Sequence, residues 1–102
     1  MSNPGKVSSL KALGYQYCKT RMTTYLLSQG EDVWNICEDM TFKVLAVADR
    51  ITPQLVAKHE HNNKAVNILF SGLGPVEFEK VIHLKIAHEI WTTLMSHHEG
   101  TA

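Results

Sequence analysis

The chain has 102 residues, of which 44% are hydrophobic and 20% charged, a composition typical of one small globular domain rather than a disordered segment. Ten Lys and Arg side chains balance ten Asp and Glu side chains, so the composition does not favour nucleic-acid binding, which usually needs a basic face. No apolar run approaches the roughly 18 residues that a membrane span needs. Residues 1–13 hold no apolar signal-peptide core, so we expect a cytoplasmic protein without membrane contact.

Residues 1–14 contain Ser, Asn, Pro and Gly with few large apolar groups, and they are predicted to form a flexible N-terminal arm before a helical domain at 15–102. Residues 1–30 contain four cations and no acid. Four dispersed cations make a weak phosphate-binding face, so RNA contact is the less favoured hypothesis. Its candidate residues are Lys6, Lys11, Lys19 and Arg21.

The first helix is predicted from about residue 15 to residue 28, because apolar side chains recur there at helical spacing and Gly30 can end it. A short second helix is predicted to begin at Glu31 and Asp32, since the N-terminus of a helix favours negative charge. The apolar positions of these two helices are Cys18, Met22, Tyr25 and Leu26, then Val33, Trp34, Ile36 and Cys37.

Residues 39–51 are the least regular part of the chain. The apolar run at 42–48 fits a strand or a buried helical turn, and it is too short for its period to decide. We predict a loop with some helical content. Thr52 and Pro53 then form a helix start, because Thr caps and Pro suits the first helical position.

The third helix is predicted over residues 53–71, with Leu55, Val56, His59, Asn62, Val66, Leu69, Phe70 and Leu73 at helical spacing. Gly72 and Gly74 break the third helix, and Pro75 begins a fourth, with Val76, Phe78, Val81 and Ile82 as its apolar positions. The fifth carries an apolar stripe of Ile86, Ala87, Ile90, Trp91, Leu94 and Met95 before Gly100. With no alternating strand pattern, the fold class is all-α, a compact bundle of about five helices.

The chemistry-bearing side chains do not form a recognisable catalytic or metal-binding pattern. The six histidines include no H-x-x-x-H pair and read as scattered surface imidazoles, and Cys18 and Cys37 read as buried free thiols. Nothing supplies the base, orienting group and oxyanion hole that a cysteine nucleophile needs. We therefore expect no catalytic residue, no metal and no cofactor.

Large apolar side chains on the helices admit two interpretations that the sequence leaves open. They pack in the core, or one of them anchors a contact between subunits, where Trp is enriched. These candidates are Trp34, Phe78, Trp91 and Met95.

Four segments, in order, resemble the Gag polyprotein of copia-type long-terminal-repeat retrotransposons. Residues 15–26 (YQYCKTRMTTYL) are similar to its Y-x-x-W-K-x-R-M-x-x-x-L opening, and residues 33–36 (VWNI) to the following V/L-W-x-I/V segment. Residues 64–78 (KAVNILFSGLGPVEF) resemble a K-A-x-x-x-I/L-x-x-x-L-x-x-E-x-F block. Residues 87–101 resemble A-x-E-I-W-x-x-L followed by H-E-G-T. The order and spacing of the four segments agree from about residue 15 to residue 101.

The resemblance implies a helical fold related to the N-terminal lobe of retroviral-type capsid proteins, with assembly of a particle shell around element RNA as its role. It departs at Cys18, where the family has Trp; an unfilled cavity there would cost roughly 3–5 kcal/mol. The second helical lobe and zinc knuckle of a full Gag are not among these residues. We therefore expect an excised domain or a natural short product, and no RNA packaging through a knuckle.

The favoured functional hypothesis is a non-enzymatic self-assembly domain, most simply a twofold homodimer. The alternative is a domesticated Gag fragment that acts as an adaptor or interfering factor and binds a host protein or full-length Gag. Both hypotheses concern protein partners rather than nucleic acid or membrane.

Overall fold

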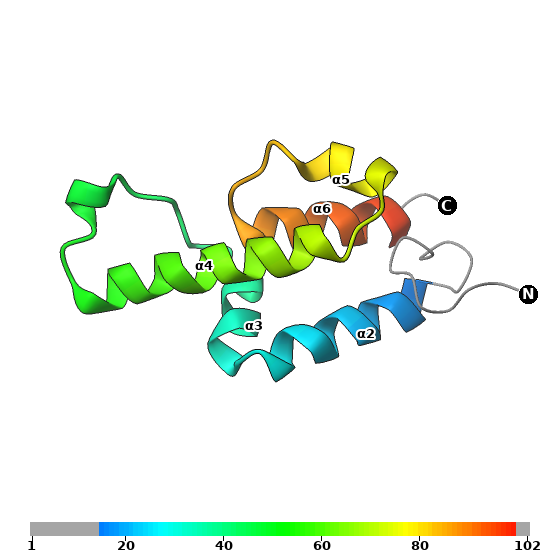
Figure 1. Ribbon diagram of the computed structural model, residues 1–102, viewed down its shortest axis with the longest axis horizontal. Coiled ribbons are helices and arrows are strands. Elements are labelled where there is room, and N and C mark those ends of the chain that lie inside the picture. Colours follow the sequence, from blue (N-terminus) through cyan, green and yellow to red (C-terminus); the bar gives the residue numbers. More distant parts are fainter. Residues whose placement is uncertain (1–14, 100–102) are drawn as a thin grey trace, which may run out of the picture.

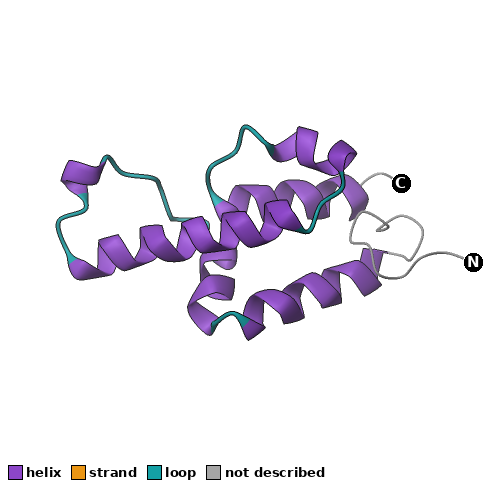
Figure 2. Ribbon diagram, viewed as in Figure 1, coloured by secondary structure: helices purple, strands orange, loops and turns teal. Residues whose placement is uncertain are grey.

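The computed structural model describes residues 15–99, and in this part of the chain helices joined by loops are present without strands (Figures 1 and 2). Its elements are α2 (Tyr15–Ser28), α3 (Glu31–Glu38), a 3-10 turn η2 (Val47–Asp49), α4 (Pro53–Ser71), α5 (Pro75–Val81) and α6 (Ala87–Glu99). The predicted all-α class, with five α-helices in the described residues, is confirmed.

Local signals fix where the helices begin and end. The Thr52 side chain accepts a hydrogen bond from the Leu55 backbone N–H at 3.1 Å, as expected of a helix N-cap. Pro53 and Pro75 occupy the first turns of α4 and α5. Gly30 joins α2 to α3 with a φ of 134°, a conformation that residues other than glycine rarely adopt. The predicted bounds of α4 are confirmed at both ends, and the predicted end of α2 at Ser28 is confirmed.

The long helix α4 is the centre of the bundle. Helix α3 packs against the middle of α4 and α6 against its C-terminal half, and α2 closes the side on which α3 lies (Figure 1). The core between them is apolar and contains Met22, Leu26, Val33, Ile36, Cys37, Phe42, Ala65, Ile68, Leu69, Val81, Ala87, Ile90, Trp91, Leu94 and Met95. The first turns of α4 extend beyond this core, beside the loop that precedes the helix (Figure 1).

Several apolar positions with helical spacing lie outside the core. Tyr25 is 52% exposed although Met22 and Leu26 on the same helix are buried. Val56 is 41% exposed because it belongs to the part of α4 that extends beyond α3 and α6. Val76 and Ile82 are also exposed, so α5 buries little besides Val81 and Glu77. Helical periodicity predicts a shared face, but it does not predict what covers that face.

Polar side chains also enter the packed region. Asn62 is 1% exposed; its Oδ1 accepts a hydrogen bond from the Ala87 N–H at 2.8 Å, and its Nδ2 donates one to the Lys85 carbonyl at 2.9 Å. The Nδ1 of half-buried His88 lies 2.8 Å from the Cys37 carbonyl, which links α6 to the end of α3. His59 is 4% exposed, so the prediction of surface imidazoles is wrong for this histidine.

Candidate interaction surface

The segment of residues 40–56, here called the projection, consists of the loop after α3, η2 and the start of α4. Phe42, near its start, packs in the core, and the rest of the loop with η2 extends away from the bundle (Figures 1 and 2). Five of the ten large hydrophobic side chains that are exposed in the described residues lie on it: Met40, Val44, Val47, Ile51 and Val56. Val47 is 77% exposed and Ile51 is 81% exposed. Scattered single apolar residues on a surface are ordinary, but a group of this kind indicates a contact site.

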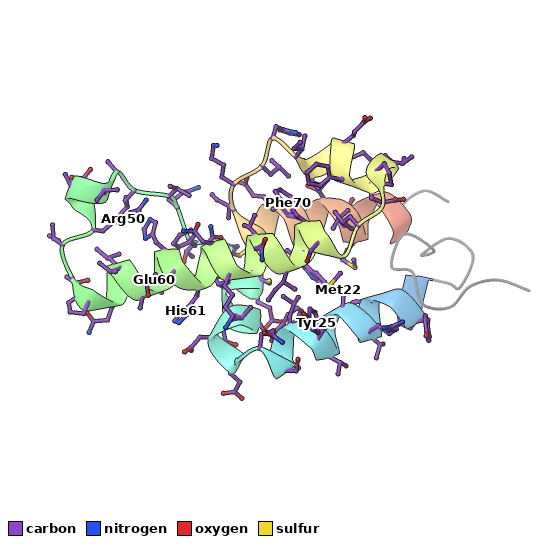
Figure 3. All side chains as sticks on the ribbon, viewed as in Figure 1. Met22, Tyr25, Arg50, Glu60, His61 and Phe70 are labelled. Atoms are coloured by element: carbon purple, nitrogen blue, oxygen red, sulfur yellow. The ribbon has the colours of Figure 1, made fainter. Side chains whose placement is uncertain are left out.

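The projection is held in place by hydrogen bonds to both backbone groups of Leu45. The Leu45 N–H donates to Nε2 of His59 at 2.9 Å. The Leu45 carbonyl accepts from Nε and Nη2 of Arg50 at 3.0 and 2.8 Å. Figure 3 shows Arg50 inside the turn of the loop, between the loop and α4. These bonds attach the middle of the loop to α4 and to its own returning limb, so the exposed apolar side chains have a defined platform.

The bonds of His59 assign its tautomer. Because Nε2 accepts from Leu45, the ring proton resides on Nδ1, which donates to the Leu55 carbonyl at 2.8 Å. The Phe42 ring packs edge-on against the imidazole, with ring centroids 4.9 Å apart. A neutral, buried histidine therefore has a structural role at the base of the projection.

A polar groove of about 510 Å³ separates α3 from the start of α4. Lys58 Nζ lies 3.3 Å from Asp39 Oδ2, and His61 Nε2 lies 3.7 Å from Asp32 Oδ2, so two acid–base pairs bridge its walls. Hydrogen bonds from the side chain and backbone of Thr41 lower the pKa of Asp39, and Lys58 adds to this effect. Because these groups are exposed or half-exposed, their pairing contributes little to stability.

A second, smaller groove of about 290 Å³ lies between α2 and the end of α4. Buried Met22 and Ile68 are among the residues lining it, together with Arg21, Tyr25, Ser71 and Gly72. Figure 3 shows Met22 and Tyr25 on the side of α2 that faces α4. Its mixture of apolar and polar groups suits one side chain of a partner rather than a catalytic reaction.

The four predicted anchor residues lie within the bundle of the single chain. The Trp34 and Trp91 rings meet edge-on with centroids 5.1 Å apart, and Trp91 is 8% exposed while Trp34 is half-buried. Half-buried Phe78 packs edge-on against Phe70, also at 5.1 Å, and Met95 is 9% exposed. Within the single chain these contacts favour a packing role for the four residues.

The predicted RNA-contact cations do not form a cluster among the described residues. Lys6 and Lys11, with the rest of the predicted N-terminal arm, lie outside that part of the chain. Lys19 is half-buried, and the exposed Arg21 guanidinium lies 5.9 Å from the centroid of the Tyr17 ring.

The chemistry of the remaining groups is limited in the described part of the chain. Among the side chains that the structure describes, no set of three or more His, Cys, Asp or Glu is placed to hold a metal. Cys37 is a buried free thiol, as predicted, and burial together with the Glu38 charge raises its pKa to about 12. The Cys18 side chain lies outside the described groups, and none of the described helices is both long and apolar enough to cross a bilayer.

Sequence reasoning did not single out the projection as a contact site, although a signal was present. Residues 42–48 are apolar at every position but Lys43, without a helical period, and Ile51 follows. An apolar run without period can be buried or exposed, and only the fold separates the two. Comparison with protein-family models, with curated proteins and with solved structures finds no match.

Proposed function

We propose that this chain is a non-enzymatic domain for protein–protein interaction and self-assembly, resembling the N-terminal capsid lobe of copia-type retrotransposon Gag. The observation that supports self-association is the projection, where Val47 and Ile51 are more than three-quarters exposed on the part that extends beyond the bundle. An exposed apolar group on a small helical domain is a feature of contact surfaces, because burying it against a partner removes apolar area from water.

The positions of the Gag-like segments support the family part of the proposal. The segment at residues 15–26 lies in α2, and the one at 33–36 lies in α3. The segment at 64–78 covers the end of α4 and the start of α5, and the last begins with α6. The resemblance therefore includes every packed helix, as expected of a shared fold rather than of a single short motif.

The test is the solution mass of the purified full chain against concentration, by light scattering after size exclusion. We expect the mean mass to rise from that of one chain toward that of two as concentration increases. A mass of one chain at every concentration up to about 1 mM would contradict self-assembly, since a functional contact weaker than that contributes under about 4 kcal/mol.

A domesticated Gag fragment that binds a host protein or full-length Gag is the second candidate. The groove between α2 and α4 favours it, because this groove offers an apolar floor at Met22 and Ile68 beside polar groups. Filling the groove with Ser71→Tyr, at an exposed position, should reduce capture of full-length Gag in a pull-down while leaving the mass of the chain alone unchanged. Equal capture by the variant and the unaltered chain would remove this candidate.

A further inference from the structure

The projection carries two exposed charges of opposite sign, one near each end of its apolar middle. Lys43 lies before Val44, and Asp49 ends η2 after Val47. Both charged side chains are exposed, and neither has an ionic or side-chain hydrogen-bond partner among the described residues. Arg50, the other charge of this loop, is instead bonded to the Leu45 carbonyl.

This arrangement is complementary to itself. In a twofold contact, residue i of one copy meets residue j of the other, and j meets i in return. With a twofold axis through the middle of the loop near Ala46, Val44 of one copy would lie near Ala48 of the other and Val47 near Leu45, so the apolar middles of the two loops would pack together. Lys43 of each copy would then face Asp49 of the opposite copy. A surface whose charges all had one sign would repel its own copy, whereas the projection carries Lys43 and Asp49, which have opposite charges.

We propose that the projection is a twofold interface with a second copy of this chain, in which the exposed apolar side chains pack together and Lys43 pairs with Asp49 across the axis. The inference rests on the proposed function and names the surface that carries it. The α2–α4 groove and the predicted anchors Trp34, Phe78 and Trp91 are not part of this contact.

The available area predicts a weak dimer. The five exposed apolar side chains offer about 300 Å² of apolar surface, given about 100 Å² for a fully exposed aliphatic side chain. Stable specific interfaces bury about 800 Å² on each partner. A contact between two projections should therefore have a dissociation constant of roughly tens to hundreds of micromolar. Such a weak contact suits an assembly that combines several of them.

The rigid attachment of Leu45 assists this weak contact. A loop that must become ordered on binding loses conformational entropy, which subtracts from affinity. The bonds from Leu45 to His59 and Arg50 hold the loop in one conformation before association. Most of the apolar area can then contribute to binding.

The apolar part is tested with Val47→Glu and Ile51→Glu in the full chain, measured by sedimentation equilibrium from about 1 μM to 1 mM. Both side chains are more than three-quarters exposed, so the fold should be unaffected, which circular dichroism checks. We expect each variant to weaken dimerisation at least tenfold. Val76→Glu is the matched control, because Val76 is 63% exposed on α5, away from the projection, and it should leave dimerisation unchanged.

The charge pairing has a sharper test. Lys43→Glu and Asp49→Lys should each weaken self-association roughly tenfold at low salt, because each places two like-charged pairs across the axis. An equimolar mixture of these two variants should dimerise about as well as the unaltered chain, since both pairs are then of opposite sign. Lys64→Glu, at an exposed position of α4, is the charge control and should have no such effect.

The outcomes separate this inference from the proposed function. If the unaltered chain dimerises but the projection variants dimerise equally well, the self-assembly proposal stands and this interface is wrong. If the single charge variants are weakened but their mixture is not restored, the twofold pairing is wrong. If the unaltered chain remains a monomer up to about 1 mM, both proposals fail and a different partner covers the projection.

Discussion

Replacement of Asn62 by alanine should destabilise the whole bundle, because this one amide joins α4 to the start of α6. Its Oδ1 accepts from the Ala87 N–H at 2.8 Å, and its Nδ2 donates to the Lys85 carbonyl at 2.9 Å. Ala87 is the first residue of α6 and is fully buried. The N–H groups of a first helical turn have no partner within their own helix, so Asn62 acts as a cap from 25 residues away.

The magnitude follows from what the substitution leaves behind. Asn62→Ala removes the partner of the buried Ala87 N–H and of the Lys85 carbonyl. An unpaired buried polar group costs about 1–3 kcal/mol, and Lys85 is exposed enough for water to replace part of its bond. A small cavity adds to the loss. We expect the free energy of unfolding to fall by about 3 kcal/mol, a large part of the 5–15 kcal/mol typical of a domain.

Urea denaturation followed by tryptophan fluorescence measures this change, because Trp34 and Trp91 meet between α3 and α6. Asn63→Ala is the matched control, with the same chemical change at the exposed neighbouring position of the same helix. It should cost less than about 0.5 kcal/mol. A loss below about 1 kcal/mol for Asn62→Ala, or a loss equal to that of the control, would refute the capping role.

Three further predictions concern single groups. With Cys18 replaced by serine, Cys37 should react with a thiol reagent at pH 8 only as the chain unfolds, and labelling of the folded chain would contradict this. The free energy of unfolding should also fall above pH 9, by up to about 1.4 kcal/mol per pH unit. The reason is that the folded thiol, with a pKa of about 12, keeps the proton that the unfolded thiol releases. Thr41→Val should raise the lowered pKa of Asp39 toward its ordinary value in an NMR titration, and an unchanged pKa would show that Thr41 is not the cause. A carboxyl with a lowered pKa stabilises the folded state above its ordinary pKa, and this stability is lost as pH falls through the lowered value. The variant should therefore lose less stability than the unaltered chain as pH falls below about 4. Gly30→Ala should lower the free energy of unfolding by about 1–3 kcal/mol in urea denaturation, because alanine is strained at a φ of 134°. A clash is not the cause, since the added Cβ would lie 3.9 Å from the nearest atom. A change within about 0.5 kcal/mol would refute the strain.

The helices could be predicted from the sequence because their signals are local. Thr52 and Pro53 start α4, Pro75 starts α5, and Gly30 separates α2 from α3. Each signal acts through the backbone conformation or hydrogen bonds of residues within one turn. The loop at 39–51 was also predicted, with its short helical piece, because neither the strand nor the helix pattern is long enough there.

The interior contacts could not be predicted, because they join residues that are distant in the chain. His59 reaches Leu45 across 14 residues, Asn62 reaches Ala87 across 25, and His88 reaches Cys37 across 51. A helical pattern shows which residues share a face, but not which of several faces meets a given side chain. For this reason the buried His59 was mistaken for a surface imidazole.

The candidate interface was missed for a related physical reason. Large aromatic residues attract attention because they dominate both cores and interfaces, so Trp34, Phe78 and Trp91 were the predicted anchors. In the fold Trp34 packs against Trp91 and Phe78 packs against Phe70, and much of the exposed apolar area belongs to smaller side chains such as Val47 and Ile51. Exposure depends on the part of α4 that extends beyond its neighbours, which no local pattern of the sequence encodes.

The way the projection is attached argues that its exposure has a use. Its apolar side chains could lose contact with water if the loop collapsed onto α4, where Val56 is also exposed. The chain instead uses a buried histidine and an arginine to hold Leu45 by both backbone groups. Those bonds fix the loop in a conformation that keeps Val47 and Ile51 in water. An arrangement that restrains apolar residues outside the core favours a partner surface, and opposite charges beside them favour a partner with the same sequence.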